Sequence, residues 1–290
     1  MKSVLKLVAL VSLCLLLAGA VLVGVWCLRD GDWKSHWENG DFNVSWNIGP
    51  DTPRDYTVCE DGKLSFDAAE VTKLDLSWYA GAVEIQTGTG GRITLTESAK
   101  QALDSDEKMC WKLEKGRLSV AANRQTKHAG IRNPPEKTLV VTVPTDWTAD
   151  ELDCDLMSAS LLLDQIGAKE LSVDSASGDM TLRDVDARRV SVDTASGEVT
   201  LYLLSEDCKV EINSVSGDIT LALATAVRTQ RVTIDTMSGD VRLQISGPVD
   251  LDFDTLSGEI KGEYIASQDK GPRITVNTAS GDLIIEKTAD

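Results

Sequence analysis

The sequence is poor in histidine and has no run of basic residues. Its two histidines, His36 and His128, lie far apart, so histidine-based zinc sites, catalytic triads and acid–base pairs are not expected. Lys plus Arg number 29 against 46 Asp plus Glu, which gives a net charge of −17. Nucleic acids and anionic membrane surfaces attract clustered cations, so neither is an expected partner. Hydrophobic residues at 42% predict a folded chain.

One long apolar run lies near the N-terminus. Residues 7–28 contain no charged side chain and follow Lys2 and Lys6. A helix of that length spans roughly 33 Å, which is enough for the ~30 Å hydrocarbon core of a bilayer. Ala18-Gly19-Ala20 resembles a signal-peptide cleavage site, which leaves a cleaved leader as the alternative, but the run stays hydrophobic beyond it. We predict an uncleaved, single-pass anchor with a cytoplasmic N-terminus and an extracytoplasmic C-terminal domain.

Four cysteines follow the apolar run: Cys59, Cys110, Cys154 and Cys208. Disulfides between Cys59 and Cys110 and between Cys154 and Cys208 would each cross-link one half of the ectodomain, but four cysteines allow three pairings. The alternative is four buried thiols that act as small hydrophobic residues. The sequence leaves both interpretations open, and no spacing among these cysteines resembles a zinc site.

A ten-residue pattern recurs six times after residue 170. Its central Ser-Gly-Asp or Ser-Gly-Glu places glycine at positions 178, 197, 217, 239, 258 and 281. A period near twenty residues is typical of a solenoid, and apolar residues alternate on both sides of the glycine as in half-buried strands. The alternation changes parity at the glycine, which predicts a corner there. We predict an all-β, single-stranded β-helix, or solenoid, with rungs of about 20 residues.

The repeat suggests four segments along the chain. We expect a cytoplasmic tip and transmembrane anchor over 1–28, a juxtamembrane segment over 29–62, an irregular β segment over 63–149 and solenoid repeats over 150–290. The final repeat ends near Glu286, so we expect the last edge of the solenoid to be uncovered at the C-terminus and able to pair with another chain.

Several of these features together resemble a known family. The apolar anchor, the stretch Ser77-Trp-Tyr-Ala-Gly-Ala-Val-Glu-Ile85, the stretch Val141-Thr-Val-Pro144 and the serial Ser-Gly-Asp repeats are similar to bacterial adhesin-like β-strand repeat domains. The resemblance covers roughly residues 63–290 and has no established activity. It implies a β-helical ectodomain on a Gram-positive bacterial envelope protein, and some relatives are encoded beside envelope-stress signalling genes. It supplies no functional residue.

Stacked repeats would align their acidic residues in columns. One column would hold the acid that follows each glycine: Asp179, Glu198, Asp218, Asp240, Glu259 and Asp282. Carboxylates ~4.8 Å apart repel one another, so such a column must face solvent or hold cations. We favour an architectural role in which side chains bond to backbone at the corners. Calcium bound between successive carboxylates is the alternative, although the calcium-binding nonapeptide of known solenoids is absent.

The sequence predicts a protein that is not an enzyme and needs no cofactor. The acids recur equally in every repeat, whereas a catalytic site needs unique residues in one place, and familiar hydrolase motifs are absent. A carboxylate-dependent, polysaccharide-active enzyme is the weaker alternative. We therefore predict a membrane-anchored extracytoplasmic solenoid with a structural or binding role, whose partner is an envelope protein or polymer. Tyr202 and Tyr264 are its candidate binding residues.

Overall fold

The computed structural model describes residues 56–122, 135–224, 230–267 and 270–287. All of them belong to one compact unit, Gly49–Asp290. They form β-strands and one short 3-10 helix, Ala68–Glu70, which confirms the all-β prediction. The predicted membrane anchor, residues 7–28, lies outside the described residues. Within the described ranges, no helix is both long enough and apolar enough to span a bilayer.

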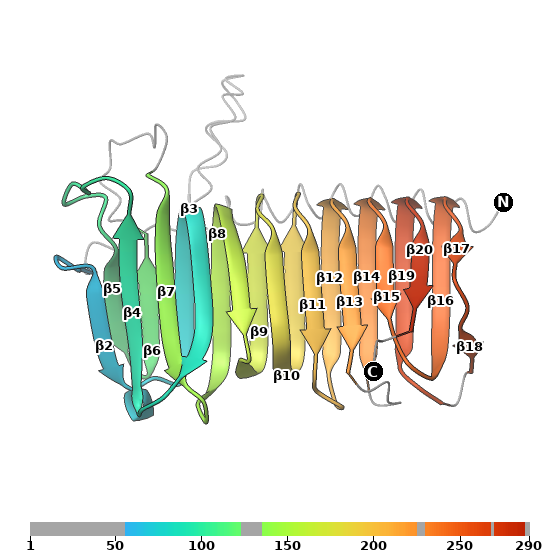
Figure 1. The fold of residues 1–290 in the computed structure, drawn as a ribbon, viewed down its shortest axis with the longest axis horizontal. Helices are drawn as coiled ribbons and strands as arrows, with labels where there is room; N and C mark the ends of the chain where they lie inside the picture. Colours follow the sequence, from blue (N-terminus) through green and yellow to red (C-terminus); the bar gives the residue numbers. More distant parts are fainter. Residues whose placement is uncertain (1–55, 123–134, 225–229, 268–269, 288–290) are drawn as a thin grey trace, which may run out of the picture. The chain divides into compact units, whose positions relative to one another are not determined.

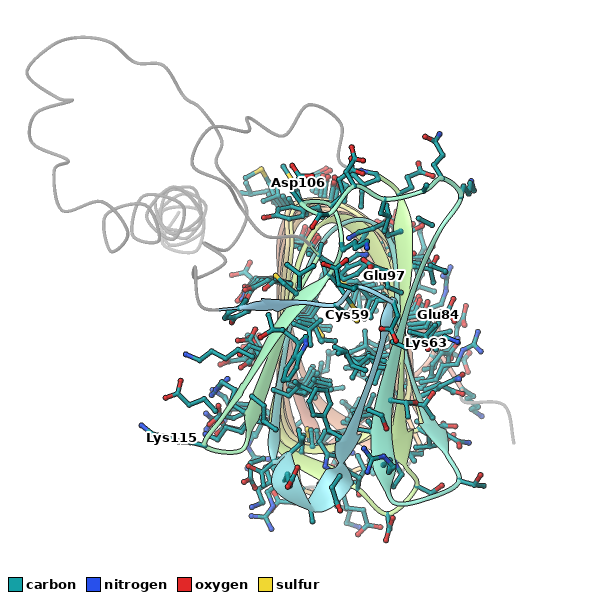
Figure 2. The ribbon with its side chains drawn as sticks, turned by 90° about the vertical axis from the view of Figure 1, so that its left-hand side faces the viewer. Cys59, Lys63, Glu84, Glu97, Asp106 and Lys115 are labelled. Carbon is teal, nitrogen blue, oxygen red and sulfur yellow. The ribbon has the colours of Figure 1, made fainter. Side chains whose placement is uncertain are left out.

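The strands form two walls that face each other across the core (Figures 1 and 2). In spatial order, wall A contains β1 (Thr57–Val58), β5 (Cys110–Glu114), β6 (Arg117–Ala121), the first half of β3 (Lys73–Gly88), the first half of β8 (Thr148–Asp164), β9 (Gly167–Ser175), the second half of β10 (Met180–Thr194), β12 (Lys209–Ser216), β14 (Arg231–Ser238), β19 (Arg273–Ser280) and β16 (Pro248–Ser257).

Wall B contains, in the same direction, β2 (Lys63–Asp67), β4 (Arg92–Ala99), β7 (Lys137–Pro144), the other halves of β3, β8 and β10, then β11 (Val199–Leu203), β13 (Ile219–Leu223), β15 (Val241–Gln244), β20 (Leu283–Glu286) and β17 (Ile260–Lys261). A short strand, β18 (Ile265–Ala266), pairs with the start of β16. A strand of wall A, its corner and the following strand of wall B make one rung.

The core lies between the walls and follows the alternation in the sequence. In the rung of β12 and β13, Val210, Ile212, Ile219 and Leu221 point inward and are fully buried. Neighbouring rungs present residues of the same kind in register, for example Ile212 beside Ile234. Each rung thus buries its apolar face only when another rung stacks on it, which is the physical basis of a repeat fold.

The corner glycines occupy positions that other residues cannot fill. Gly197 and Gly217 have φ values of +113° and +125°, which L-residues rarely adopt. A Cβ atom added to Gly217 would also collide with the carbonyl oxygen of Gly197, and one at Gly197 would collide with that of Gly178. Gly178 in turn lies against Ala159, so the corner of the β8 rung carries alanine in place of glycine.

The last two rungs are exchanged in space, which corrects the expectation about the C-terminal edge. The C-terminal rung, β19 and β20, lies between β14/β15 and β16/β17. The terminal rung is therefore β16/β17, and the glycine stack runs from Gly239 to Gly281 and then to Gly258. A reason is visible in the repeat itself. The residue that fills the core after the corner is Ile285 in the C-terminal rung but Gly262 in the terminal rung, so only the former completes an internal layer.

Candidate functional site

A Ser or Thr lies three residues before each corner glycine of the repeat, and several of these hydroxyls form hydrogen bonds across the corner. Ser175, Thr194 and Thr236 point inward, and their hydroxyls donate to the carbonyl oxygens of the serines two residues later at 3.1, 2.9 and 3.1 Å. Those serines donate onward to the preceding rung; Ser177, for example, donates to the carbonyl of Met157 at 3.4 Å. At these three corners the hydroxyls hold the turn closed and join it to the neighbouring rung, whereas the equivalent hydroxyls of Ser214 and Thr278 are buried without a hydrogen-bond partner among the described residues.

The acidic column after the glycines has the same architectural use. Asp179 accepts the backbone N–H of Glu198 at 3.0 Å, and Asp218 accepts that of Asp240 at 2.9 Å. Asp282 accepts the N–H of Glu259 at 3.0 Å. The N–H of Asp282 likewise goes to Asp240, so these bonds link the six predicted residues in two groups, Asp179 with Glu198 and Asp218 with Asp240, Asp282 and Glu259. No three metal-ligating side chains gather among the described residues. The geometry thus favours architecture, and the calcium alternative stays a prediction without support.

A second acidic column runs along the outer face of wall A, and its composition changes along the stack. Toward the C-terminal rungs aspartate alternates with asparagine: Asn213 donates to Asp193 and Asn277 to Asp235, each at 2.7 Å. Toward the other end Asp155, Asp174 and Asp193 follow one another without an asparagine. Partial burial and then the neighbouring carboxylates raise the pKa of Asp155 and of Asp174 to about 6.

Cys59, Cys110, Cys154 and Cys208 are buried, and none of the four forms a disulfide. Cys154 lies in β8 and Cys208 lies just before β12, three strands away in wall A. Three strand spacings are about 14 Å, which is beyond the reach of a disulfide. Burial raises the pKa of Cys154 and, to about 12, that of Cys208, so neither is a reactive thiolate at neutral pH. Of the two interpretations that the sequence left open, buried thiols that act as small hydrophobic residues agree with the structure.

One end of the stack is closed by antiparallel strands, and we call it the capped end (Figure 2). Here β4 pairs antiparallel with β7 and β2, while β5 pairs antiparallel with β6. Phe66 of wall B meets Trp111 of wall A edge to face, with ring centroids 5.0 Å apart. This contact joins the two walls across the end of the core and completes its burial.

A buried ion pair fixes the capped end. The side chains of Lys137 and Glu97 are only 3% and 2% exposed, and their Nζ and Oε1 atoms lie 2.7 Å apart. Lys137 also donates to the carbonyls of Glu107 and Ala122, and its ammonium lies 4.7 Å from the centre of the Trp78 ring. Burial lowers the pKa of Lys137 despite the nearby carboxylate. All donors of the ammonium are occupied, so the pair is structural, and no sequence pattern pointed to it.

A polar pocket of about 470 Å³ lies near the same end. Lys73, Lys112, Lys115 and Arg117 line it together with Tyr56, Glu114 and Ser119. Two of these cations are already neutralised, since Lys73 and Arg117 both pair with Glu151, and Arg117 also reaches Asp153 at 3.2 Å. The pocket is therefore a balanced network of charges rather than a concentrated anion site.

The opposite end is the uncapped rung, which we define as β16, β17 and β18 with the corner at Gly258. Figure 1 shows these strands at the end of the unit away from β2 and β5. Leu251 and Phe253 occupy core positions but are only half-buried, whereas Ile274 and Val276 beside them are fully buried. Leu256 is 48% exposed and Ile265 65%. Exposed apolar side chains thus gather where the stack ends.

The two predicted tyrosines do not form one site. Tyr202 lies on β11 and Tyr264 lies just before β18, and each is 38% exposed. Four strand spacings separate β11 from β17, the wall B strand of the rung that contains Tyr264, or about 19 Å. Tyr264 belongs to the uncapped rung, whereas Tyr202 stands apart on wall B. The sequence signal that was missed is Gly262, which marks the rung that cannot fill an internal layer.

Comparisons with solved structures return bacterial proteins of low identity. A candidate cell adhesion protein from Clostridium sporogenes is 15% identical, with a TM-score of 0.41, and the match covers 78% of this chain and 98% of that one. A candidate adhesin from Bacteroides fragilis is 14% identical over 77% and 96% of the two chains, with a TM-score of 0.44. A candidate lipid-binding protein from Parabacteroides distasonis is 12% identical over 77% and 96%, with a TM-score of 0.43.

A family profile, unlike the curated proteins, matches most of the described chain. No curated protein matches this chain. A family profile, in contrast, matches residues 71–287, a range that takes in the rungs of both walls and the antiparallel strands β4 to β7. The sequence-based resemblance covered nearly the same part of the chain. The chain therefore belongs to the Toastrack DUF4097 family.

Proposed function

We propose that this protein is a non-catalytic binding protein of the bacterial cell envelope. In this proposal the apolar segment predicted over residues 7–28 anchors it in the membrane, the solenoid lies outside the cell and the uncapped rung is its binding surface. The observation that carries the proposal is the contrast in burial between the two ends. Half-buried core residues and exposed Leu256 and Ile265 at one end are typical of a surface that binds a partner.

The repeated side chains support a role without catalysis. Asp179, Asp218 and Asp282 each accept a backbone N–H of the next rung in the stack, and the hydroxyls of Ser175 and Thr194 donate to backbone carbonyls, so these repeated side chains form structural bonds. The buried Lys137 and the buried thiols are enclosed and cannot reach a substrate. A link to envelope-stress signalling is part of the proposal and rests on the family resemblance alone.

Site-specific photocrosslinking in bacterial cells that produce the full chain tests this function. A photoreactive amino acid at Leu256 or Ile265 should give adducts with an envelope component, whereas the same group at Glu70, near the capped end, should not. Protease added to intact cells should degrade the solenoid. Equal adducts from both ends, or a saturable hydrolytic activity that one acid substitution abolishes, would overturn the proposal.

A further inference from the structure

The outer edge of β16 has backbone groups that no described strand uses. Asp250 donates its N–H to the carbonyl of Pro272, on the side of β19, at 3.0 Å. Backbone groups alternate in direction along a parallel strand, so those of Leu251 and Phe253 point to the other side. On that side, within the described residues, only Pro248 and Val249 are paired, with β18. The edge from Leu251 onward is therefore open to another strand.

Asp254, an outward side chain of this edge, lacks among the described residues the asparagine partner that Asp193 and Asp235 of internal rungs have. In the aspartate column of wall A, Asp193 receives the amide of Asn213, and Asp235 receives that of Asn277. Asp254 comes next in this column, beside Asn277, whose amide is already given to Asp235. Asp254 could therefore accept a hydrogen bond from a donor side chain on a further strand added in the same register. Asp250 and Asp252 lie on the same outward face and add negative charge.

The inward side chains of the edge need cover as well. Leu251 and Phe253 are half-buried at positions where the adjacent strand has the fully buried Ile274 and Val276. An added strand with apolar residues at alternate positions would bury them as an internal rung does. Covering these two side chains removes apolar area from water, which contributes favourably to association.

A second copy of this chain is a poor occupant of the edge. Antiparallel pairing of two β16 strands centred on Asp252 would oppose Asp252 with itself and Asp250 with Asp254. Like charges directly opposite one another destabilise a sheet. The capped end of a second copy offers antiparallel strands and a closed core in place of a free rung. The occupant must therefore carry donor or cationic side chains where β16 carries acids.

We propose that the outer edge of β16 binds an extended segment of another polypeptide as an added strand. The segment alternates apolar residues, which cover Leu251 and Phe253, with asparagine or cationic residues, which face Asp250, Asp252 and Asp254. This inference rests on the proposed function and names the chemistry of its partner. The inner neighbour of β16 already shows the required chemistry, because β19 sets Arg273 opposite Asp250 and Asn277 opposite Asp254.

A labelled peptide with the sequence Arg273–Ser280 is the matched probe. Fluorescence anisotropy with the purified full-length chain should show saturable binding. The same peptide with Arg273→Glu and Asn277→Asp should bind at least tenfold more weakly. In the protein, the double variant Asp252→Lys/Asp254→Lys should weaken binding of the first peptide at least tenfold, while Glu70→Lys should leave it unchanged. Both altered residues are exposed, so thermal unfolding midpoints should confirm that the variants fold.

Four results would overturn the inference. Equal binding of the two peptides would show that charge plays no part, and undiminished binding to the double variant would place the peptide elsewhere. If the chain sediments as a dimer and the double variant as a monomer, the partner at this edge is a second copy of the chain. If photocrosslinks form at Ile265 but no peptide binds, the strand-addition inference fails while the proposed binding function stands.

Discussion

The two ends of the stack differ in how far they cover the core side chains of the terminal rungs. Any solenoid must cover the core side chains of its first and last rungs. At the capped end antiparallel strands, the Phe66–Trp111 contact and the buried pair Lys137–Glu97 cover them. At the uncapped rung Leu251 and Phe253 remain half-buried, and the wall B strand, β17, has only two residues. The difference indicates that stability is concentrated at one end and that the other is available for binding.

The largest expected loss of stability comes from substitutions in the buried ion pair of the capped end. Lys137→Met removes the cation and leaves Glu97 buried without its partner, which should lower the free energy of unfolding by about 3–5 kcal/mol in urea titrations. Adding Glu97→Gln should restore a large part of the loss. The matched ion pair near the uncapped rung, Lys261 with Asp282, is exposed, so Lys261→Met should have no measurable effect. Equal losses at the two ends would contradict the comparison.

The glycine stack allows a second comparison along the solenoid. Gly239 has a φ of +118° and lies between two corners, so Gly239→Ala adds both backbone strain and a collision and should cost about 3 kcal/mol. Gly258 is at the terminal corner and can move outward, so Gly258→Ala should cost about 1 kcal/mol. Gly91, with open space around it, is the control and should tolerate alanine. A larger loss at Gly258 than at Gly239 would show that the terminal rung is held as firmly as the interior.

Neighbouring core positions give the third test. Ile274 and Leu251 are paired in register, but Ile274 is fully buried and Leu251 half-buried. Ile274→Ala should therefore cost about 3 kcal/mol and Leu251→Ala about 1 kcal/mol by thermal or urea unfolding. If the two variants lose the same stability, Leu251 must be covered in solution, and the end of the stack is not free.

The repeat made much of this fold predictable, because its evidence is local. Alternating apolar residues identify the strands, and Ser-Gly-Asp or Ser-Gly-Glu identifies the corners, so the rungs after residue 170 follow from the sequence. The spatial order of the rungs does not. Strands of equal pattern can stack in any order, and the exchange of the last two depends on how Gly262 and Ile285 fill a layer.

The capped end was less predictable, because its contacts join distant parts of the chain. Phe66 meets Trp111, and Glu97 meets Lys137, across loops that carry no periodic signal. The acidic columns were predicted as columns, but their bonds to backbone N–H groups depend on corner geometry. The candidate binding surface appeared only once the order of the rungs was known, because it consists of what the terminal rung leaves uncovered.

The smallest expected effect concerns the aspartate column and its change in composition between the ends. In the middle of wall A, Asp174 lies between Asp155 and Asp193, whereas Asp235, nearer the uncapped rung, accepts an amide from Asn277. Partial burial and the adjacent carboxylates raise the pKa of Asp174 to about 6. The folded state thus holds this proton more tightly than the unfolded state. Stability contributed by the protonated form is present at about pH 4 and is lost as the pH rises through about 6.

Asp174→Asn should remove this dependence by giving the column the donor that it has at Asn213. The variant and the parent should have similar unfolding midpoints near pH 4, where the parent carboxyl is protonated. Near pH 7 the variant should be more stable by up to about 1 kcal/mol, because the side chain is partly exposed and its repulsion is screened. Asp235→Asn, which replaces a carboxylate that already accepts the amide of Asn277, should give no such gain. A difference that grows toward low pH would have the wrong sign and would show that Asp174 is stabilised as the anion.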